Sequence, residues 1–460
     1  MMEIREYPVT EGLKVKITVD KNPFQLKPEA LFQMAARINK KRSFLFVSPV
    51  LGKHLPVNPS VSLLIGRALA LVYSSQIDKY QSLIQEVLND RARQSEFSFE
   101  AAALPQISLK RPVTIIGFCE TATALGHAFF DSFASSARYI HTTREEIAGK
   151  QVLLAFEEEH SHATAHRVYG DDSQFFADDS EVILVDDEVT TGKTNLNIIR
   201  DILRAFPHKK QFTIVSILDW RNEANQQAFR DLEQELGIVI REVSLLKGQV
   251  EELGQPIGLT DESLLTESNS SSLLLQKPLQ KKLPKFSMEQ VFDSSKTEQP
   301  PYLKATGRFG LTSEQNQNEA LAVIGQQLQA VRAGAGKCLV LGTGEFMYLP
   351  MKIASYMGSN VVFHTTTRSP ILSRNEQGYP ISQKRQFPSP EQPGATNYVY
   401  GVAEEKQYQD IFVFFERVVS REHLNELNRI LGTVRGTKLY FVDLVSRSLY
   451  QSVIGSVLKR

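Results

Sequence analysis

Two neighbouring carboxylates, Asp186 and Asp187, come directly after the aliphatic residues 182–185, and Glu188 follows them. A turn rich in threonine comes next, with the residues Thr190, Thr191, Gly192, Lys193 and Thr194. Carboxylates accept hydrogen bonds from adjacent sugar hydroxyls, and backbone N–H groups at the start of a helix bind a phosphate. Residues of these types in this order therefore predict a site for a ribose 5-phosphate.

The tripeptide Gly-Lys-Thr at 192–194 is also the end of an ATP-binding P-loop. That motif needs a glycine five positions earlier, so that successive N–H groups can wrap a triphosphate. Position 187 is an aspartate, whose charge would repel the phosphates. Pattern and charge together therefore exclude an ATPase of this class.

The apolar pattern predicts the elements that hold this turn. Residues 182–185 are typical of a strand buried on both faces of a parallel sheet. The acidic pair then stands at the carboxyl end of the strand, where open α/β sheets bind ligands. A helix is predicted after the turn, with an apolar stripe that consists of Leu196, Ile199, Ile202 and Leu203. Another buried strand is predicted at 113–116, and a third ends in His141, Thr142, Thr143 and Arg144.

This stretch resembles the 5-phosphoribosyl 1-diphosphate (PRPP) motif of type I phosphoribosyltransferases: an aliphatic strand, two acidic residues, two variable positions and Thr-Thr-Gly-x-Thr. The resemblance implies a parallel-sheet α/β fold and a pentosyl-transferring enzyme with Mg²⁺ bound through PRPP, without direct protein ligands. Asp186 and Asp187 would hold the ribose hydroxyls and the turn the 5-phosphate, and Glu188 is a candidate proton acceptor near the base. A strand-turn-helix with a solvated acidic end is the alternative.

Two other segments are candidates for ligand contact. In the resembling family, the loop after the strand at 113–116 contacts the diphosphate, and here Glu120, Thr121 and Ala122 occupy that loop. Near the N-terminus, Lys53 and His54 are expected on the acceptor side, by a looser resemblance to orotate phosphoribosyltransferase.

A histidine-rich segment contains His160, His162, His166 and Arg167. Its spacing is not the His-x-x-x-His of a zinc helix, and no second cluster completes a metal site. Type I enzymes carry a flexible loop over the active site at this place, so the resemblance implies that these residues close on the diphosphate. A polar surface hairpin is the alternative.

Composition limits the class of protein. The chain has 460 residues, 42% hydrophobic and 23% charged, with zero formal net charge. This length predicts two or three domains, and the neutral balance gives no footprint for nucleic acid or an anionic membrane. Two cysteines are too few for a disulfide framework. No apolar run is long enough to span a membrane, and the charged N-terminus lacks an apolar signal core, so a cytoplasmic enzyme is expected.

The sequence divides near its middle. Serine, lysine, glutamine and proline are frequent from about residue 260 to 300, which is typical of a linker. We therefore expect a phosphoribosyltransferase-like domain at 1–259, a linker at 260–300 and a second domain at 301–460. A surface excursion within one domain is the alternative.

The second half repeats features of the first in the same order. Gly342 and Glu345 follow an aliphatic run as Gly117 and Glu120 do, and His364 heads a threonine run as His141 does. This order predicts a second α/β domain that is a degenerate copy of the first. Opposite the acidic pair the copy has Phe414 and Phe415, so no sugar site is expected there.

The second half also contains the tetrapeptide Thr367, Arg368, Ser369 and Pro370. It resembles the TRSP domain of proteins in bacterial tellurite-resistance and stress gene clusters, which implies a role in the synthesis of a nucleoside-like metabolite. Arg368 at a strand end could bind an anion, and a capping turn is the alternative.

The expected partners are PRPP, a small-molecule acceptor, a second copy in a homodimer and proteins from the same gene cluster, without membrane or nucleic acid. Two other functions stay open. One is a PRPP-sensing regulator without turnover, and the other is phosphoribosyl transfer to a partner protein.

Overall fold

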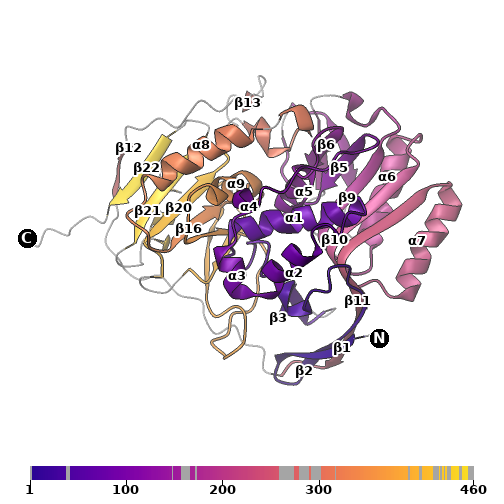
Figure 1. Ribbon diagram of the computed structural model, residues 1–460, viewed down its shortest axis with the longest axis horizontal. Coiled ribbons are helices and arrows are strands. Elements are labelled where there is room, and N and C mark those ends of the chain that lie inside the picture. The colour runs from indigo at the N-terminus through magenta and orange to yellow at the C-terminus, as the bar shows by residue number, and fades with distance from the viewer. Residues whose placement is uncertain are drawn as a thin grey trace, which may run out of the picture.

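A computed structural model describes residues 3–453, apart from 38–41, 148, 157–165, 171–172, 258–273, 279–289, 292–301, 316, 392–393, 403–406, 418–423, 425–426, 429, 432–436 and 445–447. Two sheets lie side by side, and helices α1, α5 and α9 lie between them (Figure 1). In the described part of the chain, no helix has the length and apolar character needed to cross a bilayer.

The larger sheet belongs mainly to the first half. Its strands, in spatial order, are β1 (Glu3–Thr10), β2 (Leu13–Lys21), β11 (Val239–Gly254), β10 (Gln211–Asp219), β9 (Glu181–Val189), β5 (Val113–Gly117), β6 (Ala137–His141) and β15 (Leu311–Thr312). The strands β11, β10, β9, β5 and β6 run parallel. The predicted parallel-sheet α/β fold is therefore confirmed.

The smaller sheet belongs to the second half. Its strands, in spatial order, are β12 (Leu274–Pro278), β22 (Ser448–Val453), β21 (Lys438–Asp443), β20 (Asp410–Phe415), β16 (Cys338–Gly342) and β17 (Val361–Thr365). The order β21-β20-β16-β17, all parallel, repeats the order β10-β9-β5-β6 of the first sheet. The second half is thus built on the same core of strands.

Helices and small hairpins complete the halves. The helices are α1 (Pro59–Tyr73), α2 (Gln81–Asn89), α3 (Arg91–Glu96), α4 (Phe99–Ala102), α5 (Ala122–Phe130), α6 (Lys193–Ala205), α7 (Glu223–Leu236), α8 (Asn318–Gln329) and α9 (Tyr348–Ser355). The two-stranded pairs are β3 (Gln33–Ala36) with β4 (Phe44–Val47), β7 (Val152–Phe156) with β8 (His166–Tyr169), β13 (Gln290–Val291) with β14 (Tyr302–Leu303), and β18 (Lys384–Pro388) with β19 (Thr396–Tyr400).

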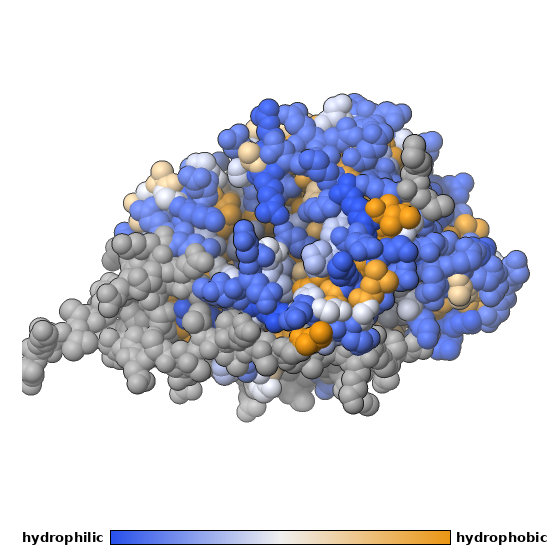
Figure 2. Space-filling view, turned by 90° about the horizontal axis from the view of Figure 1, so that it is seen from below, coloured by the Kyte–Doolittle hydropathy of each residue, from blue (hydrophilic) through white to orange (hydrophobic). Residues whose placement is uncertain are grey.

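Burial explains why these segments take these forms. Every residue of β5 and residues 182–185 of β9 are buried, as expected for central strands covered on both faces. On α6 the buried apolar residues are Ile198, Ile199 and Ile202, while Leu196 and Leu203 are partly buried against the core. The face of the molecule seen in Figure 2 is mainly hydrophilic, with small apolar areas.

The two halves exchange short segments. Val57, just before α1, pairs with Phe363 of β17 through N–H···O bonds of 2.9 and 2.7 Å. In the same way Leu311 of β15, which precedes α8, pairs with Tyr139 of β6. Each half therefore adds a strand segment to the edge of the other. The segment at 260–300 contributes β12 and β13, and the domain boundaries stay a prediction.

Candidate active site

A pocket of about 340 Å³ lies at the carboxyl ends of β5 and β9. β5 has β6 on one side and β9 on the other, so this is the point where the strand order reverses, which is where open α/β sheets bind ligands. The lining residues come from both halves and are Lys53, Phe118, Cys119, Glu120, Thr121, Arg144, Phe156, His166, Asp186, Asp187, Thr194, Arg368 and Ser369.

The end of β9 brings the acidic pair into this pocket. Asp186 and Asp187 are both half-buried, and a carboxylate oxygen of Asp186 accepts the N–H of Asp187 at 2.9 Å. Glu188 is not in the lining, because it forms an ion pair of 2.8 Å with Arg42. Burial raises the pKa of the Glu188 carboxyl, and the Arg42 guanidinium opposes that shift. Glu188 thus pairs with Arg42 and does not line the pocket, although the neighbouring Asp187 carboxylate also raises its pKa.

The threonine-rich turn leads into α6. Gly192 has a left-handed backbone (φ 72°), and a Cβ there would lie 2.5 Å from the Phe229 ring, so the turn requires glycine. Of the turn residues, only Thr194 lines the pocket, while Thr190 and Lys193 are exposed and Thr191 is half-buried. The first N–H groups of α6 have no partners within the helix, which suits a bound anion.

The loop after β5 forms the opposite wall. The Cys119–Glu120 peptide bond is cis, and the Cys119 N–H donates to the Thr142 hydroxyl at 2.9 Å. The Lys53 ammonium donates to the Thr121 hydroxyl, and Ala122 begins α5, where it is buried. Burial raises the pKa of the Cys119 thiol far above its usual value, so this thiol stays protonated and is no candidate nucleophile.

Glu120 contacts the second half. Its carboxylate accepts the Thr367 hydroxyl at 2.7 Å and the Arg368 backbone N–H at 3.4 Å. The Thr367 hydroxyl in turn accepts the Ser369 N–H at 3.1 Å. Arg368 and Ser369 are half-buried in the pocket, and Pro370 is exposed.

The other predicted site residues are divided between the pocket and its surroundings. His166 lines the pocket, with its Nδ1 3.1 Å from the Thr142 hydroxyl. Arg167 forms an ion pair of 2.5 Å with Glu146, and His160 and His162 lie outside the described residues. His54 is buried with its ring against Tyr400 of the second half, and burial lowers the pKa of its imidazole well below the usual value. The structure does not bring His54 to the pocket.

Sequence reasoning missed three kinds of contact: the rings of Phe118 and Phe156, the cation of Arg144, and the reach of Arg368 into the first half. A signal for the two arginines was present, since each follows a threonine run at a strand end. Within the described residues, no group of three His, Cys, Asp or Glu side chains is placed to hold a metal ion.

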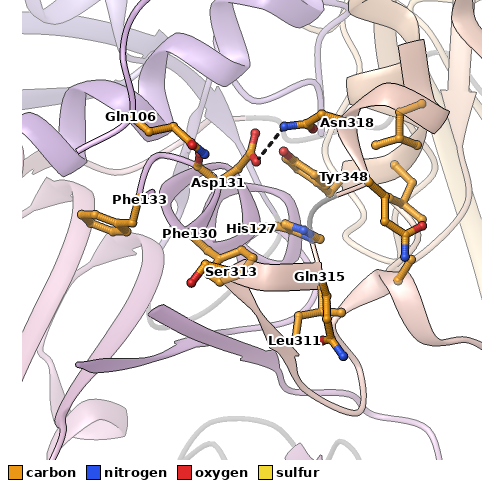
Figure 3. A pocket seen from close by; sticks show the side chains of 14 residues that line it. Gln106, His127, Phe130, Asp131, Phe133, Leu311, Ser313, Gln315, Asn318 and Tyr348 are labelled. Carbon is orange, nitrogen blue, oxygen red and sulfur yellow. Dashed lines mark hydrogen bonds between the residues drawn. The ribbon is translucent and has the colours of Figure 1, made fainter. Parts of the chain in front are cut away.

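Two other cavities have different characters. One of about 30 Å³ lies between the halves, where His127 stacks on Tyr348 at 3.7 Å and Asn318 donates to Asp131 at 3.2 Å (Figure 3). It has room for about one water molecule. A hollow of about 930 Å³ lies at the amino ends of β5, β9 and β10, at the opposite edge from the acidic pair.

Comparison with known families matches both halves. Residues 31–249 match the family described as "Phosphoribosyl transferase" (PRTase_2), and residues 305–431 match the one described as "TRSP domain C terminus to PRTase_2". Comparison with curated proteins finds no match.

Similar solved structures include three phosphoribosyltransferases. The adenine enzyme of Trypanosoma brucei is 13% identical, with 50% of this chain and 82% of that chain covered and a TM-score of 0.31. The adenine enzyme of Giardia lamblia is 14% identical, with 50% of this chain and 98% of that chain covered and a TM-score of 0.29. A hypoxanthine-guanine enzyme of Bacillus anthracis is 12% identical, with 37% of this chain and 71% of that chain covered and a TM-score of 0.20.

Proposed function

Because the N-terminal half of this chain is a phosphoribosyl transferase domain and its C-terminal half contains a TRSP domain, we propose that it moves ribose 5-phosphate from PRPP to a nitrogenous base or a similar acceptor and releases diphosphate. The observation that carries the proposal is the convergence of Asp186, Asp187 and Thr194 on one pocket at the strand-order reversal.

In this proposal Asp186 and Asp187 accept hydrogen bonds from the two ribose hydroxyls, and Thr194 with the first N–H groups of α6 holds the 5-phosphate. The C1–O bond to diphosphate breaks as the acceptor nitrogen forms its bond to C1, and the departing diphosphate takes up the proton that the nitrogen loses. Positive charge then develops on the ribose ring, and the two carboxylates beside it favour that charge. Lys53 and Arg144 offset the charge of the diphosphate.

Mg²⁺ fits these residues in a limited sense. Asp186 and Asp187 would hold water molecules around Mg²⁺ with their carboxylate oxygens, and the direct ligands would come from the substrate and water. The ion, when bound, neutralises negative charge on the departing diphosphate. Beyond charge, the chain's own contribution is to hold the ribose and its phosphate in position.

The cytoplasmic location, and the role in making a nucleoside-like metabolite in a stress or tellurite-resistance pathway, are part of the proposal and rest on sequence alone. A PRPP-sensing regulator would bind PRPP without turnover, and a protein-modifying enzyme would release diphosphate only with a protein acceptor.

The test is diphosphate release by the full chain with PRPP, Mg²⁺ and each of adenine, hypoxanthine, guanine and orotate, followed by identification of the nucleotide formed. We expect release with an acceptor, and loss of release in Asp186→Asn/Asp187→Asn. The control Asp20→Asn/Asp78→Asn makes the same charge change at two exposed positions. Undiminished release in the site variant would contradict the roles of the aspartates, and binding without release would favour the sensor.

A further inference from the structure

Arg368 belongs to the second half, yet it lines the pocket of the first. Its backbone N–H is held by Glu120. Among the described residues, no hydrogen-bond or ion-pair partner is found for its guanidinium. A half-buried arginine without a partner beside a polar pocket is placed to bind an anion that enters it.

The position of Arg368 follows from a reciprocal arrangement of the halves. Glu120 of the first half accepts the Thr367 hydroxyl at 2.7 Å, and Glu345 of the second half accepts the Thr143 hydroxyl, also at 2.7 Å. Glu345 likewise accepts the backbone N–H of Arg144, at 3.0 Å, as Glu120 accepts that of Arg368. Reciprocal contacts of this kind, in which equivalent residues of the two sides bind each other, are typical of a two-fold dimer interface.

We propose that the second half acts as a built-in partner subunit, and that Arg368 completes the pocket by binding the diphosphate of the substrate. This inference rests on the proposed function, and it assigns the ligand of the TRSP motif. The Asp186 side of the pocket is suited to the sugar, whereas Arg368 is tied to Glu120, on the loop side where a diphosphate would lie.

Charge supports this assignment. Among the described residues that line the pocket, the carboxylates are Glu120, Asp186 and Asp187, and the cations of the first half are Lys53 and Arg144. The first half alone therefore offers more negative than positive side chains to a ligand that is itself an anion. The guanidinium of Arg368 corrects this imbalance, and its planar fork can donate two parallel hydrogen bonds to phosphate oxygens.

Glu120 is then a positioning residue, because its carboxylate holds the turn from which Arg368 projects. Substitution of the Arg368 side chain leaves the two hydrogen bonds to Glu120 in place, since they come from the Thr367 hydroxyl and from a backbone N–H. The guanidinium can therefore be removed without releasing the second half from the first.

Calorimetric titration of the full chain with PRPP and with inorganic diphosphate, each with Mg²⁺, tests the proposal. We expect Arg368→Ala to weaken both affinities about 10- to 100-fold and Arg368→Lys to lose less, as for removal of a charge-assisted hydrogen bond. The control is Arg204→Ala, which removes an exposed arginine at the end of α6.

The outcomes separate this proposal from the function on which it rests. If wild type binds PRPP and Asp186→Asn/Asp187→Asn does not, but Arg368→Ala stays within about twofold, Arg368 has no such role and the function stands. If wild type binds neither PRPP nor diphosphate, both proposals fail.

A double-mutant cycle tests the positioning role of Glu120. We expect Glu120→Ala to weaken diphosphate binding in the wild-type background, because it releases Arg368, and not to weaken it further in the Arg368→Ala background, where only the loss of a negative charge beside the anion remains. Additive losses would show that Glu120 acts on the ligand by another route.

Discussion

The two halves share a strand order but differ in what occupies the carboxyl ends of the equivalent strands. In the first half, β9 carries Asp186 and Asp187 near its carboxyl end, and both line an open pocket. In the second half, β20 ends in Phe414 and Phe415, which are both buried. The next residue, Glu416, forms an ion pair of 2.7 Å with the buried Arg308.

The equivalent cations Lys53 and Arg308 also differ in their partners. Each follows a glycine, Gly52 or Gly307, that packs against the edge strand of the other half. Lys53 donates to Thr121 in the open pocket. Arg308 donates instead to Glu345 at 2.6 Å and to Glu416 at 2.7 Å. In the second half the cation is therefore paired with protein carboxylates, whereas in the first half the cation lines a pocket that is open to a ligand.

The largest expected effect is on ligand binding. Asp186→Asn/Asp187→Asn should reduce PRPP affinity about 1000-fold or more, because a neutral amide replaces each carboxylate and the charge-assisted hydrogen bonds to the ribose are lost. Titration should give one PRPP per wild-type chain and none per variant chain, since buried phenylalanines cannot accept hydrogen bonds from ribose hydroxyls. A second PRPP per chain, or a site that persists in the variant, would show that the second half binds PRPP as well.

Arg308 and Lys53 occupy equivalent positions, and we expect the first to support stability and the second to support ligand binding. Arg308→Ala leaves Glu345 and Glu416 buried without their partner, so we expect the free energy of unfolding to fall by about 3–5 kcal/mol. Lys53→Ala, its matched control, should change stability by less than about 1 kcal/mol, and it should weaken PRPP binding. Chemical denaturation and titration of both variants provide the measurements. Equal losses of stability would remove the distinction between the two sites.

Glu391 offers a test by pH in the second site. It accepts the Thr343 hydroxyl at 3.0 Å and the Glu416 N–H at 3.2 Å, and burial together with Glu416 and Glu145 raises its pKa to about 7 against the pull of Arg417. The folded state then holds a proton that the unfolded state releases near pH 4.5, so this stabilisation is lost as pH rises from about 4.5 to 7.

Glu391→Gln should therefore remove that part of the pH dependence. We expect the variant to exceed wild type by about 3 kcal/mol in unfolding free energy at pH 8 and by much less at pH 4.5. Denaturation across this range, with exposed Glu11→Gln as the control, measures it. A constant difference between variant and wild type at all pH values would contradict the raised pKa.

The parts of this architecture that could be predicted from the sequence are those that depend on local pattern. The strand at 182–185 and its position in a parallel sheet follow from burial on both faces, and the repeat follows from Gly117 and Gly342 at equivalent strand ends. The match of His141 with His364 was wrong by one residue. Thr142 and Thr366 make the equivalent N–H bonds to Gly117 and Gly342, and a run of three threonines permits either alignment.

Contacts between the halves could not be predicted, because they depend on packing between segments far apart in the chain. The threonine run before Arg368 predicts an anion contact, but nothing in the sequence indicates that this arginine enters the pocket of the other half or that Glu120 holds Thr367. The pairing of Glu188 with Arg42 has the same origin. The roles of these residues in ligand binding stay predictions.

The smallest expected effect concerns the two glycines at which each half packs against the sheet of the other. It tests whether these two contacts contribute equally to stability. Gly52 and Gly307 both have left-handed backbones, with φ of 74° and 88°. A Cβ at Gly52 would lie 2.6 Å from the Phe363 ring, and one at Gly307 would lie 2.5 Å from the Tyr139 ring, in each case a ring of the other half's sheet. Alanine at either position therefore adds a steric clash to the backbone strain.

Gly378→Ala is the control for strain alone, because Gly378 has φ of 85° and no heavy atom within 4 Å of its Cβ position. We expect Gly52→Ala and Gly307→Ala to lower the free energy of unfolding by similar amounts, each about 1 kcal/mol more than Gly378→Ala. Chemical denaturation of the three variants measures the differences. Gly52 precedes Lys53 of the open pocket, and Gly307 precedes the ion-paired Arg308. Equal losses of stability would mean that both contacts between the halves stabilise the fold equally, whether or not the adjacent site is open to a ligand. A loss at only one of the two positions would mean that the halves interlock on one side alone.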